Sequence, residues 1–163
     1  MQELKGVQVL KQTDNHPLPV LNDHTINFLL ISDDKDDVMT LVNEFRNDKI
    51  ANPLFIENND IGALNLIKQK DSEENSILNT WIILLDINSP TANGFKILKK
   101  LQAEVKFQNL KVFVMTSSHE VKAQIEAANY QVSGYIGKPI SFDKFASAIS
   151  VLNYKWHLTD EQI

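Results

Sequence analysis

Residues 80–94, TWIILLDINSPTANG, join an apolar run to a turn-like segment through a single aspartate. The first half of this stretch, Ile82 to Leu85 followed by Ile87, has the composition of a strand buried on both faces. Asp86 stands at the end of that run, where burying a carboxylate without a partner is costly. Asn, Ser, Pro and Gly follow it, and these residues are typical of a turn. This pattern raises the question of which partner the Asp86 carboxylate has.

The composition is that of one domain with a hydrophobic core. The chain has 163 residues, of which 43% are hydrophobic, and it has no cysteine for a disulfide or a thiolate zinc site. The net charge of −5 argues against general binding to nucleic acid or to anionic membranes. No apolar run approaches the roughly 20 residues of a membrane helix, and the N-terminus lacks a signal-peptide pattern. We therefore expect a soluble, cytoplasmic protein.

Short apolar runs alternate with helix-type periodicity along most of the chain. The predicted strands are residues 26–32, 53–57, 80–86, 110–118 and 132–139. The predicted helices are residues 37–48, 59–70, 93–106, 120–130 and 142–156, with a polar loop at 70–79. In the second helix, Ile61, Leu64 and Ile67 are expected to face inward. Five strand–helix repeats predict a parallel sheet with helices on both faces.

The two ends of the chain differ from this regular middle. Residues 1–24 show no sustained period and contain prolines at 17 and 19, so we interpret them as an N-terminal arm. The folded domain is expected to cover residues 25–157, and residues 158–163 form a C-terminal tail. About ten residues follow the core of the last helix, too few for a DNA-binding domain. Any output is therefore expected to go through protein contacts.

Polar side chains follow the predicted strands at the points where they end. Asp33 and Asp34 follow the first strand, Asp86 ends the third, Thr116 ends the fourth and Lys138 ends the fifth. Ligands of open α/β sheets bind at the carboxyl ends of the strands. Three carboxylates, a hydroxyl and an ammonium are therefore expected to meet at one edge of the sheet.

The chemistry of such a cluster points to phosphoryl transfer. Crowded carboxylates repel one another and need a proton or a cation among them. Mg²⁺ suits the cluster because it takes one or two carboxylates and keeps several waters. A carboxylate beside Mg²⁺ can attack a phosphoryl donor and become an aspartyl phosphate, while the metal and a lysine neutralise the transferred oxygens. A threonine hydroxyl can then bond to the product.

These residues, in this order, resemble the motifs of the receiver domain of two-component response regulators. The resemblance covers about residues 26–152. It implies a doubly wound, five-stranded parallel sheet of the flavodoxin-like α/β fold, with strand order 2-1-3-4-5. Stand-alone receivers of the phytochrome-associated type are the most similar, because of the polar loop before the third strand, the Thr-Ser-Ser at 116–118 and the YKWHL ending at 154–158.

The resemblance also implies a role for each site residue. Asp86 is then the phosphoacceptor, Lys138 contacts the phosphoryl group through a cis Lys138–Pro139 bond, and Thr116 and Tyr135 form a switch pair. The implied Mg²⁺ ligands are Asp33, Asp34, Asp86 and the backbone carbonyl of Asn88. Lys35 and Ser89 depart from the residues usual in the family, but neither removes a chemical group.

The function implied is that of a single-domain response regulator. It accepts phosphoryl from a sensor histidine kinase or a phosphotransfer protein and hydrolyses it, and it is otherwise not an enzyme. Phosphorylation would repack the face made by the fourth helix, the fifth strand and the fifth helix, which is also the expected contact with a downstream protein or a second copy.

Other interpretations remain open at this point. Asp33 and Asp34 alone could simply open the next helix, where acids favour the helix dipole. The domain could be a receiver-like interaction module that works without phosphorylation, which the intact set of site residues argues against. A phosphatase of the haloacid dehalogenase type also uses an aspartyl phosphate, but Asn88 stands where that family has a second aspartate.

Overall fold

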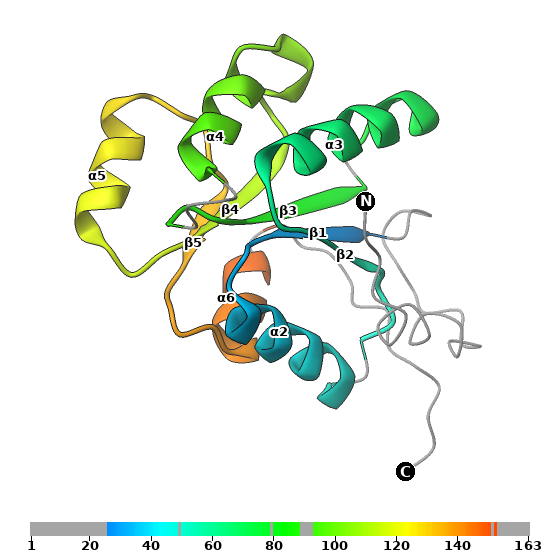
Figure 1. Ribbon diagram of the computed structural model, residues 1–163, viewed down its shortest axis with the longest axis vertical. Helices are drawn as coiled ribbons and strands as arrows, with labels where there is room; N and C mark the ends of the chain where they lie inside the picture. Colours follow the sequence, from blue (N-terminus) through cyan, green and yellow to red (C-terminus); the bar gives the residue numbers. More distant parts are fainter. Residues whose placement is uncertain (1–25, 49, 79, 89–92, 151, 153–163) are drawn as a thin grey trace.

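The computed structural model describes residues 26–48, 50–78, 80–88, 93–150 and 152. Five parallel strands form one sheet in the order β2-β1-β3-β4-β5 (Figure 1). The strands are β1 (Asn27–Ile31), β2 (Leu54–Glu57), β3 (Trp81–Asp86), β4 (Lys111–Met115) and β5 (Gly134–Ile136). The predicted fold class and strand order are confirmed. The predicted N-terminal arm and C-terminal tail lie outside the described residues.

Helices cover both faces of this sheet. They are α2 (Lys35–Asn47), α3 (Asp60–Glu74), α4 (Gly94–Gln102), α5 (His119–Ala127) and α6 (Phe142–Ser150), with a 3₁₀ turn η1 (Val105–Phe107). Figure 1 shows α3, α4 and α5 on one face and α2 with α6 on the other. None of the helices in the described part of the chain is long and apolar enough to cross a membrane.

Alternate residues of the strands supply the two halves of the core. Leu29 and Ile83 belong to the cluster under α3, α4 and α5, whereas Phe28 and Ile82 belong to the cluster under α2 and α6. In the second cluster the ring of Phe28 lies 5.5 Å from that of Phe45 and 5.4 Å from that of Phe145, so aromatic contacts join β1 to both helices. The continuous apolar runs in the sequence thus reflect burial on both faces.

Helix α3 differs from its prediction in both length and phase. It continues through residues 71–74, which were expected to be loop, and it ends at Asn75 with a left-handed φ of 63°. The prediction that Ile61 faces inward is wrong, because its side chain is 68% exposed. Asn59 caps the helix, and the buried face of the helix contains Ala63, Leu66 and Ile67.

Gly62 lies on this helix where a side chain would displace the carboxylate of Glu57. A Cβ at this position would collide with the carboxylate of Glu57, which is buried at the end of β2. Gly94, at the start of α4, is also tightly approached, since a Cβ there would lie 2.8 Å from the Cα of Ile87. Both glycines therefore allow a helix to begin close against the end of a strand.

Candidate functional site

The carboxylate of Asp86 is buried at the end of β3, with only 1% of the residue's surface exposed. Its Oδ2 accepts a hydrogen bond from the hydroxyl of Ser32 at 2.9 Å. Its Oδ1 accepts from the ammonium of Lys138 at 3.0 Å and from the backbone N–H of Asn88 at 3.3 Å. Both oxygens of the carboxylate are therefore partnered, which offsets the cost of burying it at the end of β3.

The polar residues that follow β1 make different contacts, although two of them are adjacent aspartates. Ser32, itself buried, reaches Asp86 with its hydroxyl and accepts the N–H of Asp34 at 3.1 Å. Asp33 follows and is half-buried. Asp34 is exposed and caps α2, where its Oδ1 accepts the N–H groups of Asp36 and Asp37 at 2.9 and 3.2 Å. The helix-opening role that was an alternative for both acids is thus the observed contact of Asp34.

Asp37 is a site residue that the sequence analysis missed. Its Oδ2 lies 2.8 Å from the ammonium of Lys138, so the lysine sits between the carboxylates of Asp37 and Asp86. Partial burial acts to lower the pKa of Lys138, but the bonds to Asp37 and Asp86 outweigh it and raise that pKa above its usual value. The signal was the position of Asp37 in the first helical turn, which can be interpreted only once the cap residue is known.

Thr116 lies at the end of β4 and is fully buried. Its hydroxyl accepts hydrogen bonds from the N–H of Ser118 at 3.1 Å and from the side-chain amide of Asn88 at 3.4 Å. Ser118 in turn caps α5 by accepting the N–H of Val121 at 3.1 Å. Thr116 and Asn88, two of the predicted site residues, are therefore in direct contact beside Asp86.

Ser117 joins the ends of β4 and β5, a contact that the sequence analysis also missed. Its hydroxyl donates to the backbone carbonyl of Lys138 at 2.6 Å and accepts the backbone N–H of Lys138 at 2.8 Å. The Lys138–Pro139 bond is cis, as the resemblance implied. The ammonium of Lys144 donates to the carbonyl of Pro139 at 2.9 Å. Side-chain bonds thus hold the backbone that presents Lys138 to Asp86.

Tyr135 lies in β5, half-buried against the core under α3, α4 and α5. The ammonium of Lys122, on α5, lies 5.3 Å from the centre of its ring. Burial raises the pKa of the Tyr135 phenol, and the charge of Glu126 adds to the effect. The backbone N–H of Thr116 donates to the carbonyl of the neighbouring Ile136 at 3.0 Å, so the two predicted switch residues belong to adjacent, bonded strand ends.

The donor groups at this edge can be compared with the needs of Mg²⁺. Within the described ranges, no group of three or more His, Asp or Glu side chains is placed to hold a metal ion. Ser32 supplies a hydroxyl beside Asp86 where a further carboxylate would complete such a group. Asp33, Asp86 and the carbonyl of Asn88 remain, and this set fits Mg²⁺, which typically binds one or two carboxylates and keeps several waters.

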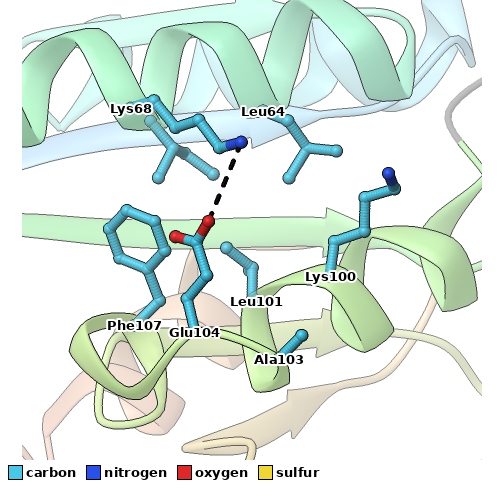
Figure 2. A pocket seen from close by; sticks show the side chains of 8 residues that line it. Leu64, Lys68, Lys100, Leu101, Ala103, Glu104 and Phe107 are labelled. Atoms are coloured by element: carbon cyan, nitrogen blue, oxygen red, sulfur yellow. Dashed lines mark ion pairs between the residues drawn. The ribbon is translucent and has the colours of Figure 1, made fainter.

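A cavity of about 190 Å³ lies elsewhere, between α3 and the end of α4 (Figure 2). Apolar side chains from both helices and η1, including Leu64, Leu101 and Phe107, line it. The ammonium of Lys68 and a carboxylate oxygen of Glu104 lie 3.8 Å apart there. None of the predicted site residues lines this cavity. The candidate site is therefore defined by its polar groups at the strand ends and is separate from this hollow.

Comparison with known proteins identifies the family. Residues 29–150 match the family model of the response regulator receiver domain. The chain is 27% identical over 110 residues to response regulator Rcp1 of Synechocystis, covering 68% of this chain and 74% of Rcp1. It is 28% identical over 99 residues to the probable transcriptional regulator ycf29 of Pyropia yezoensis. That match covers 61% of this chain and only 41% of the ycf29 protein.

Solved structures agree with the sequence comparison. The bacteriophytochrome response regulator RtBRR superposes with a TM-score of 0.68 at 26% identity, covering 83% of this chain and 82% of RtBRR. The Mn²⁺-bound form of Rcp1 superposes with a TM-score of 0.57 at 25% identity, covering 77% of this chain and 91% of Rcp1. The chain belongs to the response regulator receiver domain family, whose members are signalling proteins of two-component and phosphorelay systems.

Proposed function

We propose that this domain accepts a phosphoryl group on Asp86 from a phosphohistidine of a sensor histidine kinase or a phosphotransfer protein. The observation that carries the proposal is the buried Asp86 carboxylate, which has the Lys138 ammonium 3.0 Å from one of its oxygens. The domain would catalyse only this uptake and the later hydrolysis of its own phosphate. With such a donor, we expect the reaction to take place in the cytoplasm.

The transfer uses groups that already contact Asp86. A carboxylate oxygen of Asp86 attacks phosphorus, the bond from phosphorus to the imidazole nitrogen breaks, and the nitrogen keeps the electron pair. Lys138, which carries a positive charge, donates to the oxygens of the transferred group. Asp33, Asp86 and the Asn88 carbonyl would hold Mg²⁺, which neutralises phosphoryl oxygens when bound.

Asp34 was predicted to share in binding the metal, and that prediction stays open. One of its carboxylate oxygens accepts two backbone N–H groups as the cap of α2. A ligand set without Asp34 already meets the usual needs of Mg²⁺. We therefore propose Asp33 as the principal carboxylate from the β1 side.

The phosphorylated state would be sensed by Thr116 and Tyr135. The Thr116 hydroxyl, which now accepts from Asn88 and Ser118, would turn to donate to the phosphoryl group. Tyr135 would then move inward and repack the face made by α5, β5 and α6. This face is the proposed contact with a downstream protein or with a second copy of the chain. Equal exposure of Tyr135 with and without phosphate would count against this switch.

Intact mass spectrometry tests the function. The protein is incubated with Mg²⁺ and a small acyl phosphate, beside an Asp86→Asn variant and a sample with the metal chelated. One added phosphate in the wild type, absent from both controls, is the expected result. A folded wild type that gains no phosphate would contradict the proposal.

A phosphorylation-independent interaction module is the second candidate. The observation that favours it is Ser32, whose hydroxyl occupies the place beside Asp86 where another carboxylate would strengthen metal binding. Titration with Mg²⁺, followed by amide NMR shifts at the ends of β1 and β3, separates the two candidates. Shifts that saturate at millimolar Mg²⁺ support phosphoryl transfer, and their absence supports the module.

A further inference from the structure

The ammonium of Lys138 is held from two sides. Asp86 contacts it from the end of β3 at 3.0 Å, and Asp37 contacts it from the first turn of α2 at 2.8 Å. The Asp37 side chain is 15% exposed and the Lys138 side chain 24%. The shorter of the two contacts is thus made by a residue without a role in the proposed chemistry.

The position of Asp37 follows from the way α2 begins. Asp34 caps the helix and accepts the backbone N–H of Asp37, so the first turn is fixed where the β1 end meets the site. Asp36, one residue earlier in the same turn, is exposed. Two neighbouring aspartates of one turn therefore differ in surroundings, and of the two only Asp37 has an ion pair with Lys138 among the described residues.

A second contact limits the conformational freedom of the Lys138 side chain. Its ammonium is a point charge on a flexible four-carbon stem and has three N–H donors. A single bond to Asp86 leaves the stem free to adopt several rotamers. A second carboxylate, 2.8 Å away, restricts the position of the ammonium by its charge.

We propose that Asp37 is a positioning residue for phosphoryl transfer, which holds the ammonium of Lys138 beside Asp86 before the phosphoryl group arrives. The inference rests on the proposed function, because it gives Lys138 a reaction to serve. Asp37 acts through Lys138 and does not touch the reacting atoms. The same geometry explains why the ammonium is in place although Ser32 contributes no charge on the β1 side.

The test compares Asp37→Asn with Asp36→Asn, which removes the same charge from the same turn. Initial rates of phosphate gain are measured with a small acyl phosphate at saturating Mg²⁺. We expect Asp37→Asn to slow uptake by about tenfold or more, the effect of losing a bond to a charged group, and Asp36→Asn to change it less than about twofold. In a Lys138→Met background, Asp37→Asn should have no further effect, because its route of action is gone.

A second readout does not depend on phosphorylation. The ε-methylene NMR signals of Lys138 in the metal-free protein should move in Asp37→Asn and stay in place in Asp36→Asn. Equal rates and equal signals in the two variants would overturn the proposal, as would an Asp37→Asn effect that persists without Lys138. If the wild type gains no phosphate while the Lys138 signal still responds to Asp37→Asn, the holding contact stands and the proposed function fails.

Discussion

The ends of β4 and β5 build their side of the site from chemically different residues, whereas the end of β1 builds its side largely from aspartates. On the first side, Thr116 and Ser117 offer hydroxyls, Lys138 offers an ammonium and Pro139 offers a cis peptide bond. On the second side four of the five residues from Asp33 to Asp37 are aspartates. On the first side the type of each residue indicates its contact, whereas on the second side only the structure shows which aspartate makes which contact.

The contacts make this difference concrete. Ser117 bonds the Lys138 backbone through its hydroxyl, and Lys138 supplies the cation beside Asp86. At the end of β1, Asp34 caps a helix and Asp37 holds the lysine, although either carboxylate is chemically able to do the other's task. Backbone direction at the start of α2 therefore decides which acid serves the site.

Loss of Lys138 should have the largest effect on the rate of phosphate uptake. A Lys138→Met variant leaves Asp37 and Asp86 without their shared cation and should slow phosphate uptake by about a hundredfold or more. The control is Lys68→Met, which removes an exposed ammonium that pairs with Glu104 away from the site. Rates from intact mass spectrometry check both variants. Similar rates for the two would show that Lys138 has no special part in the reaction.

The next largest effect should distinguish the two acids that follow β1 by their influence on the Mg²⁺ requirement. Asp33→Asn should raise the Mg²⁺ concentration needed for half-maximal phosphate uptake by at least about tenfold, the loss that even outer partners of a metal ligand can cause. Asp34→Asn should leave that requirement nearly unchanged, because asparagine caps helices as well as aspartate does. Titration of uptake against Mg²⁺ measures both. An equal rise in the two variants would mean that both acids serve the metal.

Removal of the Ser117 hydroxyl should modestly destabilise the protein, because this hydroxyl joins the ends of β4 and β5. Ser117→Ala loses both bonds to the Lys138 backbone, and since these groups are reached by water we expect a loss of about 1 kcal/mol in the free energy of unfolding. Ser150→Ala removes an exposed hydroxyl bonded to the Ser147 carbonyl and is the matched control. Urea unfolding compares them. Equal unfolding midpoints for the two variants would show that the bonds of Ser117 to the Lys138 backbone do not stabilise the protein.

The smallest expected effect is on alkaline stability. The pKa of Lys138 is raised by Asp37 and Asp86 despite partial burial, so its contribution to folding is complete below the unfolded pKa of about 10.4 and is lost as the pH rises through the higher folded value. Urea unfolding between pH 8 and about 11 should therefore show a steeper alkaline decline in the wild type than in Lys138→Met. Parallel curves would contradict this.

Much of the fold could be predicted because short runs of consecutive residues determine where the strands and helices form. Runs such as residues 82–85 are apolar throughout only when a strand is buried on both faces, and five of them separated by helices leave few topologies. The phase of α3 could not be predicted in this way, because the cap at Asn59 determines it. Ile61 is exposed for that reason, while the apolar pattern alone favoured burial.

The site was predictable to the extent that a strand end brings a distinctive group. Asp86, Thr116 and Lys138 were expected there, and Asp86 and Lys138 are in contact. The pairing of Asp37 with Lys138 depends on how α2 packs against the sheet. The hydroxyl of Ser32 reaches Asp86 because β1 and β3 pair in a register that sets Ile31 beside Leu85. Such contacts join residues far apart in the chain, and no local pattern encodes them.

The position of the phosphoryl group in the chain decides whether Asp86 is the phosphoacceptor. After incubation with Mg²⁺ and an acyl phosphate, borohydride reduces an aspartyl phosphate to homoserine and marks its site. Cleavage after lysine and arginine then puts Asp86 in peptide 71–96, Asp33 and Asp34 in peptide 12–35, and Asp37 in peptide 36–46. We predict the mark at Asp86 alone. A mark at Asp33, Asp34 or Asp37, or no mark in a folded protein, would contradict the proposal that Asp86 is the phosphoacceptor.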